Sequence, residues 1–555
     1  MASPHRPDLS AAPALQVRHM RQVLLWPLRL MPVSAAGGHG QRPWELLQAL
    51  GDSSPWQEWI DEYTGSPERF HERHYSEFVT FLPYVQQFLY GEGGSRGGAL
   101  AESSMRVFRR RDVAAVRLQA RRDAAPLVLQ VVHVNLYFFY DVDVMLLEVE
   151  VRADDLSLAQ AQELLYRFGR AYPSGWDADG EPLHSLTAVD WLGADGRVLA
   201  SSDAQQREGY LSYVAQHRAP RIASHWDFLL QPLVPDHAER DGALRYRQIA
   251  YYRMPVLAYL ALDEPQALSR SDFVRLGLVT GAGSDDHQLP YGEQHLADFE
   301  RRYCYDRFWS AGGAAPHTRY LCCGHALVVV GPADSTFFRC EQRGVLAQFR
   351  HQHLLLFLIA HFQKAALLMY SDRLVEALKD LDIRNADSVK QFKRAIRGSF
   401  ESFLRFTHRY WFHAVSEQAQ ARALFRLSAD HLELDALYIE VKERMADMNS
   451  YLETDSLRRQ ANTVVRLTVV TIFGLIGTLT TGFLGMNLLA AAEQPMGERI
   501  FYFMLVLIAT IVLTVYTMVK SKRLSDFLDA LSNERLPWRA KLWSFLQLWR
   551  GGPVD

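Results

Sequence analysis

The sequence predicts an α+β domain followed by a long α-helical stalk and a two-helix transmembrane hairpin. The first part of the chain holds short apolar runs, some of them alternating, separated by Gly-rich loops. Between Gly344 and Gly474 the chain contains no proline and only one glycine, Gly398. Such a scarcity of helix breakers is typical of long helices. Two uncharged stretches follow, 467–492 and 500–519. Each is long enough to cross the hydrocarbon core of a bilayer, about 30 Å thick.

Composition narrows the function classes. A chain of 555 residues can hold two or more domains, and its net charge of −3 gives no indication of nucleic-acid binding. The four cysteines are irregularly spaced, so they predict no disulfide framework and fit a reducing compartment. The apolar run Val23–Met31 is too short for a secretory signal and is broken by Pro27. We therefore expect it to form a first buried strand.

Residues 1–341 are expected to form a mixed α/β domain that includes an insertion. Apolar runs predict strands, and a one-sided apolar pattern predicts a helix over 155–172. The expected strands after the first are 128–139, 144–151, 188–192, 274–280 and 326–330.

Residues 342–420 are expected to form a helical hairpin from helices at 342–380 and 386–417. The apolar run Leu354–Ala360 is only seven residues long and is flanked by histidines, so it predicts a buried core helix rather than a membrane span. Residues 421–486 contain no early helix breaker. They predict one stalk helix, roughly 100 Å long, that continues into the first membrane span at about 464–486.

Basic residues near the spans predict the topology. They lie before the first span and after the second, whereas the connecting loop 487–499 contains a single basic residue, Arg499. Both termini are therefore expected in the cytoplasm, because positive charge is retained on that side. The basic and aromatic tail, 520–555, is expected either on the inner membrane surface or docked on the stalk.

One face of the first span is rich in small and hydroxyl-bearing residues. Spacings of three and four place these residues on one side of a helix: Val464, Leu467, Thr471, Leu475, Thr478, Gly482 and Gly485. Such a face suits a pore. The pattern Gly477, Thr481 and Gly485 equally predicts close helix packing without a pore, so the span composition leaves both open.

The tripeptide Gly485-Met486-Asn487 ends the first span. Together with the large preceding soluble part and the two spans, it resembles the CorA family of divalent-cation channels, which carry Gly-Met-Asn at this place. The resemblance implies a homopentameric, funnel-like channel of the inner membrane that carries Mg²⁺, with Co²⁺ or Ni²⁺ as further cargo. It implies a selectivity filter at Gly485, Met486 and Asn487.

The resemblance further implies that the face from Val464 to Gly482 lines the pore. Its apolar residues would gate the pore by dewetting, and its threonines would hold waters of a hydrated ion. An amide ring at Asn487 would accept hydrogen bonds from the water shell of Mg²⁺ without removing it. Capping of a helix end is the alternative role for this side chain, and the two roles are compatible.

Some residues depart from the family pattern. Leu484 replaces the usual aromatic residue, and no proline precedes the loop acid Glu493. A ring of Glu493, joined by Glu498, would concentrate cations at the pore mouth. The alternative, that Glu493 is a solvated loop residue without a role at the pore mouth, is equally open. Zinc transport on the same scaffold therefore stays an alternative, as does a membrane-tethered oligomeric binding module without transport.

Other sequence features give weaker indications of function. The resemblance implies a regulatory Mg²⁺ site among stalk acids between subunits, although a solvated helix face is the default for each acid. The adjacent Cys322 and Cys323 lack CxxC geometry, which favours buried thiols over a zinc site. Residues 281–283 give only half of a dinucleotide-binding fingerprint after the expected strand. No catalytic motif is found, so neither an enzyme nor an organic cofactor is expected.

Overall fold

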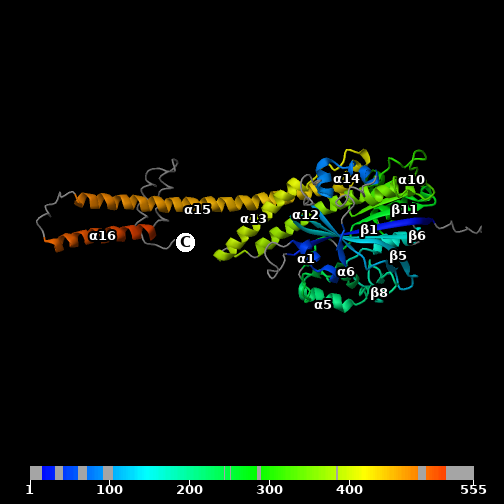
Figure 1. The fold of residues 1–555 in the computed structure, drawn as a ribbon, viewed down its shortest axis with the longest axis horizontal. Coiled ribbons are helices and arrows are strands. Elements are labelled where there is room, and N and C mark those ends of the chain that lie inside the picture. The colour runs from blue at the N-terminus through cyan, green and yellow to red at the C-terminus, as the bar shows by residue number, and fades with distance from the viewer. Residues whose placement is uncertain are drawn as a thin grey trace, which may run out of the picture. The chain divides into compact units, whose positions relative to one another are not determined.

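The computed structural model describes residues 15–31, 42–59, 72–91, 104–242, 244–250, 252–283, 289, 291–379, 381–382, 385–485 and 495–519. The chain divides into two compact units, residues 1–445 and 446–555. The first unit contains a large sheet with helices around it, and the second contains apolar helices (Figure 1).

The described strands of the first unit form one mixed sheet of 14 strands, in which β1 is central. The main path runs through β12 (Cys304–Tyr305), β13 (Arg319–Cys322), β14 (Ala326–Pro332), β11 (Val256–Leu262), β1 (Gln16–Leu30), β6 (Val142–Ser157), β5 (Leu127–Phe139), β4 (Ala115–Gln119), β7 (Ala188–Leu192) and β8 (Val198–Ser201). The branches are β10 (Arg245–Gln248) with β9 (Val234–Pro235), and β3 (Met105–Arg110) with β2 (Trp56–Glu58). Most pairs are antiparallel, but β11 runs parallel to β14 and β9 runs parallel to β10.

Most of the predicted strands are confirmed, but one is wrong. The run Val23–Met31 forms the last part of the long strand β1, which ends at Leu30. The expected strands at 128–139, 144–151, 188–192 and 326–330 correspond to β5, β6, β7 and β14. The expected strand at 274–280 is instead the helix α7 (Arg270–Leu278). Ser269 caps this helix by accepting a hydrogen bond from the backbone N–H of Asp272, whose carboxylate bonds back to the cap. This capping box fixes a helix start that the apolar pattern concealed.

Shorter helices lie around the sheet. The expected helix at 155–172 is α4 (Leu158–Arg167), which Ser157 caps. The others before residue 341 are α1 (Pro43–Ala49), η1 (Gly51–Ser53), α2 (Glu72–Phe78), α3 (Pro83–Tyr90), α5 (Arg207–His217), α6 (Ser224–Leu230), η3 (Pro265–Ala267), α8 (Glu293–Leu296), α9 (Phe299–Tyr303) and α10 (Thr336–Arg339). A buried cluster of Trp26, Trp191 and Trp226 lies in the core, where its rings meet edge to face.

The helical segment expected at 342–380 is α11 (Val345–Gln348), the π-helical turn η4 (Phe349–His353) and α12 (Leu354–Lys379). α12 packs against β1 and β6 and is largely buried, so the core-helix prediction is confirmed. α13 (Ala386–Arg409) begins at the expected residue and packs on α12, but it ends at Arg409 and not at the expected residue 417. The two helices therefore belong to the same compact unit as the sheet rather than to a separate domain.

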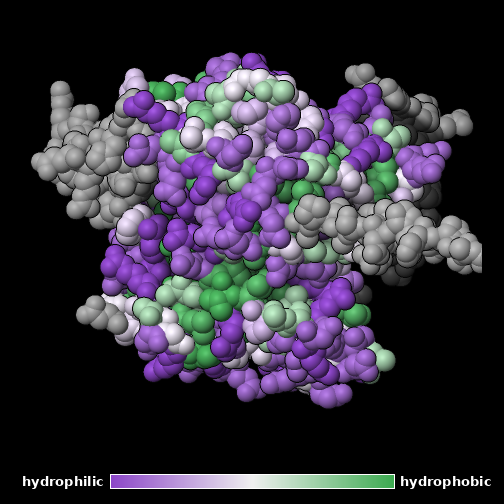
Figure 2. Space-filling view, turned by 90° about the vertical axis from the view of Figure 1, so that its right-hand side faces the viewer, coloured by the Kyte–Doolittle hydropathy of each residue, from purple (hydrophilic) through white to green (hydrophobic). Residues whose placement is uncertain are grey.

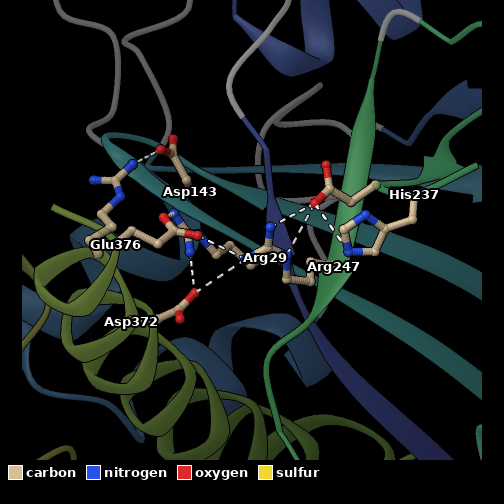
Figure 3. A network of polar contacts seen from close by, with 8 residues as sticks. Arg29, Asp143, His237, Arg247, Asp372 and Glu376 are labelled. Carbon is tan, nitrogen blue, oxygen red and sulfur yellow. Dashed lines mark hydrogen bonds and ion pairs between the residues drawn. The ribbon is translucent and has the colours of Figure 1, made fainter. Parts of the chain in front are cut away.

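A network of ion pairs joins α12 to the sheet (Figure 3). Arg29 of β1 pairs with Asp372, and its Nη2 donates to Glu376 Oε2 at 2.6 Å. Arg247 of β10 donates to Glu376 at 2.8 Å and to Asp236 at 2.7 Å. Burial alone would raise the pKa of Glu376, but the two guanidiniums outweigh it and lower that pKa. The network therefore favours the ionised carboxylate and fixes α12 on the sheet.

The single stalk helix expected over 421–486 is wrong. The chain forms α14 (Ala419–His431), then a break, then α15 (Leu434–Gly485), a continuous helix of 52 residues. Glu433 lies at the break with φ of 55°, in the left-handed region that few residues other than glycine adopt. α16 (Met496–Val519) contains the expected second span and begins four residues before it. The tail 520–555 lies outside the described residues.

The face of the first unit that Figure 2 shows is mostly hydrophilic, with a smaller hydrophobic area near the middle. α16 differs, because it exposes large apolar side chains along its length, among them Ile500, Phe501, Leu505, Ile508 and Val512. Such an apolar helix is unsuited to water and fits a lipid or protein environment.

Candidate functional site

Two described helical segments are long and apolar enough to cross a membrane, judged by length and composition alone. They are Val345–Lys379, which is 78% buried inside the protein, and Met496–Leu513, which has none of its window buried. The first is the core helix of the sheet unit. The second lies in α16, and the apolar stretch Thr463–Leu475 lies in α15. The segments that remain for a bilayer are therefore those of the expected hairpin.

The face of α15 that was predicted to line a pore is exposed. The largest apolar side chains on it, Val464, Leu467 and Leu475, are 61%, 67% and 62% exposed. Thr471, Thr478, Gly482 and Gly485 are also exposed. A Cβ added at Gly482 or Gly485 would meet no atom within 4 Å. Within one chain, this face is therefore available for contact with water, ions or a second copy of the helix.

A different stripe of α15 is covered. Residues at a spacing of four are less exposed than their neighbours: Val465, Val469, Phe473, Gly477 and Thr481. Val469 is only 2% exposed. A Cβ added at Gly477 would lie 3.0 Å from Cγ2 of Thr510 on α16, so the two helices come close at this glycine. This stripe therefore carries the packing of the hairpin, as small residues do between membrane helices.

The two faces of α15 are nearly opposite. With about 100° per residue, the predicted pore face spans an arc of about 80°, and its centre lies about 160° from the centre of the covered stripe. The pore and packing interpretations of this span, which the sequence left open, therefore apply to different sides of one helix. Only Gly485 was part of both patterns, and it is exposed.

The threonine hydroxyls on the exposed face have a defined orientation. Thr471 Oγ1 donates to the carbonyl of Leu467 at 2.9 Å, and Thr478 Oγ1 donates to the carbonyl of Gly474 at 2.8 Å. A hydroxyl has one donor and two acceptor lone pairs. With the hydrogen bound to the helix, the oxygen can only accept. It is therefore suited to the O–H groups that the water shell of a cation presents outward.

The central residues of the predicted filter lie outside the described residues. Gly485 is the last residue of α15, while Met486, Asn487 and Glu493 are not among the residues that the structure describes. Glu498 lies in the first turn of α16 and is exposed. A carboxylate there is favoured by the partial positive charge of the helix N-terminus.

The stalk acids are exposed where their side chains are described. These are Asp430, Glu433, Asp435, Glu440, Glu443, Asp447 and Glu453. Several have local partners, such as Glu440 with Arg444 and Glu453 with Asn449. Among the described residues of one chain, no three His, Cys, Asp or Glu side chains form a group that could hold a metal ion. A regulatory site made by two subunits stays a prediction.

The remaining motifs have structural roles in the described residues. Cys322 is buried in β13, where its Sγ lies 3.4 Å from Ser428 Oγ. Burial raises the pKa of Cys322, and it raises the pKa of Cys323 to about 12. Both groups therefore favour the protonated thiol. The predicted burial is confirmed for Cys322, whereas Cys323 is half-buried. Gly281 follows the helix α7 and not a strand, so the half fingerprint lacks the strand that phosphate binding by this motif requires.

Sequence reasoning made no prediction for a group of polar residues in the sheet, of which Asn135, Glu148 and Glu150 are buried and His133 is half-buried. His133 and Asn135 on β5 and Glu148 and Glu150 on β6 lie on one face of two paired strands. Their signal in the sequence is a polar residue at every second position within apolar strands. That spacing places them together on one side of the sheet.

Fold and site define a class of protein: a large mixed α/β unit that precedes apolar helices suited to a bilayer. No known family model matches this chain, and no curated protein or solved structure matches it either. The likeness to CorA channels therefore rests on the tripeptide, the two apolar stretches and their place in the chain.

Proposed function

We propose that the chain is one subunit of a CorA-like channel for divalent cations, with Mg²⁺ as the preferred ion and Co²⁺ or Ni²⁺ as further cargo. Two helices cannot enclose a pore, so the proposal requires a homo-oligomer, for which the family likeness suggests a pentamer. The observation that carries it is the exposed face of α15, which lies opposite the packing stripe and ends at Gly485, the first residue of the tripeptide.

The chemistry of this face suits a hydrated ion. Acceptor oxygens of Thr471 and Thr478 would contact the water shell, and a ring of Asn487 amides would do the same at the mouth. Mg²⁺ loses its waters reluctantly, so neutral acceptors would pass it without binding it too tightly. The apolar residues Val464, Leu467 and Leu475 would form a section that closes by dewetting.

The membrane potential supplies a sufficient driving force. An inside-negative potential of 100 mV is worth about 4.6 kcal/mol for an ion of two charges, so inward movement needs no other energy source. The proposal locates the protein in the inner membrane, with both termini and the sheet unit in the cytoplasm. Mg²⁺ bound between stalk acids of neighbouring subunits would close the channel when the ion is abundant.

Ion uptake into proteoliposomes tests the proposal. The purified full-length chain is reconstituted, and entry of Mg²⁺, Co²⁺, Ni²⁺ and Zn²⁺ is compared under an imposed inside-negative potential. We expect potential-driven Mg²⁺ entry that Asn487→Ala abolishes while assembly is kept. Asn449→Ala is the matched control, because Asn449 lies before the span and contacts only Glu453 of its own helix among the contacts described.

The other outcomes assign the alternatives. Zinc entry that follows a pH gradient instead of the potential would indicate a zinc transporter on the same scaffold. No flux of any ion from a verified oligomer would contradict transport. The hairpin would then tether and oligomerise the sheet unit.

A further inference from the structure

The first unit contains a cavity of about 460 Å³ between one face of the sheet and the helices that cover it. The sheet contributes side chains from β3, β5 and β6, and the cover comes from α2, α3, η4 and the start of α12. This volume is typical of pockets for small molecules. No catalytic or transport role assigned above uses this cavity.

The sheet side of the cavity is built on a buried carboxylate. Glu148 is fully buried and accepts hydrogen bonds from Asn135 Nδ2 at 2.8 Å and from the hydroxyl of Tyr137 at 2.7 Å. Nε2 of His133 lies 3.0 Å from its other oxygen. Burial opposes a charge on either group, but Glu148 and Glu150 raise the pKa of His133, while His133 and the hydroxyl and amide donors lower the pKa of Glu148. The pair is therefore held in its charged form.

A second buried carboxylate lies beside it. Glu150 accepts from Arg21 Nη1 at 2.7 Å, and its other oxygen lies 3.5 Å from Nδ1 of His133. Arg21 also reaches Glu341, which is largely exposed and does not line the cavity. The two carboxylates of the sheet are thus already compensated by cations without a ligand.

The opposite side presents two side-chain nitrogens that lack hydrogen-bond partners. Arg350 and His351 are consecutive residues in the π-helical turn η4, a type of turn that is frequent at functional sites. Nε of Arg350 is buried without a hydrogen-bond partner, and its nearest carboxylate oxygen, on Glu150, is 3.8 Å away. Nε2 of His351 also lacks a partner, while Nδ1 lies 3.1 Å from Glu77. Buried polar nitrogens without partners are costly unless a ligand satisfies them, and Arg350 Nε can act only as a donor.

Apolar and aromatic side chains complete the lining. The guanidinium of Arg109 stacks on the ring of Trp59 at 3.8 Å, which forms a flat surface at one side. Leu89, Leu354 and Leu355 also line the cavity. A pocket with a few polar groups on an otherwise apolar lining is characteristic of sites for organic molecules.

The charged groups around the cavity balance one another once Glu341, the second partner of Arg21, is counted. Four carboxylates (Glu77, Glu148, Glu150 and Glu341) face four cations (Arg21, Arg109, Arg350 and protonated His133), so no carboxylate is in excess to repel an anion. We propose that this cavity binds an organic anion of metabolite size, with its carboxylate or phosphate on Arg350 and His351 and its apolar or aromatic part beside Trp59 and the leucines. The inference is independent of ion transport.

Calorimetric titration of the full-length protein in detergent tests this site. Adenosine monophosphate represents an aromatic phosphate, and indole-3-acetate represents an aromatic carboxylate. Adenosine and indole-3-acetamide are the neutral counterparts, and inorganic phosphate is the anion without an aromatic part. We expect saturable binding of at least one aromatic anion below about 1 mM, with its neutral counterpart and inorganic phosphate at least about tenfold weaker.

Variants assign the binding to the cavity. Arg350→Gln should weaken binding of the aromatic anion by about tenfold or more, since it removes a charged donor, whereas Arg207→Gln, at an exposed position of α5, should leave it unchanged. If Arg350→Gln fails to fold, His351→Asn serves the same comparison. No binding of either aromatic anion overturns the proposal. Equal binding by the neutral counterparts, or by a folded Arg350→Gln or His351→Asn variant, also overturns it.

Discussion

Replacing Glu148 by alanine should destabilise the sheet unit strongly. The side chain is fully buried and holds three partners, at 3.0 Å for His133, 2.8 Å for Asn135 and 2.7 Å for Tyr137. Alanine would leave these donors buried without an acceptor, and it would leave the His133 cation without its nearest counter-charge. Removing one partner of a buried ion pair typically costs about 3–5 kcal/mol, so we expect a loss of that size in the free energy of unfolding.

Urea unfolding of the detergent-solubilised chain, followed by tryptophan fluorescence, measures this loss. Nine of the twelve tryptophans, from Trp26 to Trp411, precede residue 434, so the signal reports mainly on the sheet unit. Glu148→Gln should cost less than Glu148→Ala, because the amide keeps the volume and one acceptor oxygen. Glu239→Ala, at an exposed position, should change the free energy of unfolding by less than about 0.5 kcal/mol. A loss below about 1 kcal/mol for Glu148→Ala would refute the reasoning.

Three further changes have expected results. The pKa of His133 is raised above its ordinary 6.5 in the folded protein. Its charge therefore stabilises the fold fully below pH 6.5 and less as the pH rises through the folded-state pKa. The loss of unfolding free energy caused by His133→Gln, measured by urea unfolding across pH, should therefore shrink above pH 6.5. Gly477→Leu should disrupt hairpin packing against Thr510, whereas Gly482→Leu should leave the hairpin intact and lower ion flux, as measured by thermal unfolding and uptake assays. Arg29→Met should cost about 1–3 kcal/mol in the free energy of unfolding, because its partners are partly exposed and water replaces some of the lost contacts. An unchanged free energy for Arg29→Met would contradict the role given to the α12 network.

The secondary structure of the sheet unit was largely predictable. β5, β7 and β14 are apolar runs of β-branched and aromatic residues, and the sequence places each within a few residues. α7 was missed because the buried residues 273–279 read as an apolar strand, while the local capping box of Ser269 and Asp272 sets the helix. Order and pairing of the strands could not be predicted, because β1 pairs with β6, β10 and β11, which are far from it in sequence.

The break between α14 and α15 had no signal in the sequence. Glutamate favours a helix by its propensity, yet Glu433 adopts a left-handed conformation. It lies between α14, which packs on α12 and β13, and the start of α15, where Leu434 and Val441 are buried. Tertiary packing therefore overrides local preference at this point. The covered stripe of α15 could not be predicted from local sequence either. The first span contains both a predicted pore face and a small-residue packing pattern, and only the close approach of α16 at Gly477 shows which side packs.

The cavity in the sheet could have been anticipated only in part. Polar residues at alternate positions of β5 and β6 indicate a shared face, but the sequence does not say that Arg350 and His351 lie opposite. Those two residues come from a helical turn more than 200 positions after His133. The site therefore depends on how η4 is placed over the sheet.

Cysteine block of ion flux tests the central claim, that the exposed face of α15 lines a pore. Thr478→Cys places a thiol on that face and Thr481→Cys places one on the covered stripe, three residues away. Each is reconstituted in proteoliposomes, and Mg²⁺ uptake is measured before and after a cationic methanethiosulfonate reagent, with the unmodified chain as control for its four native cysteines. We predict block of Thr478→Cys and little effect on Thr481→Cys or the control. Block of Thr481→Cys alone, or of neither variant while both conduct, would contradict the account.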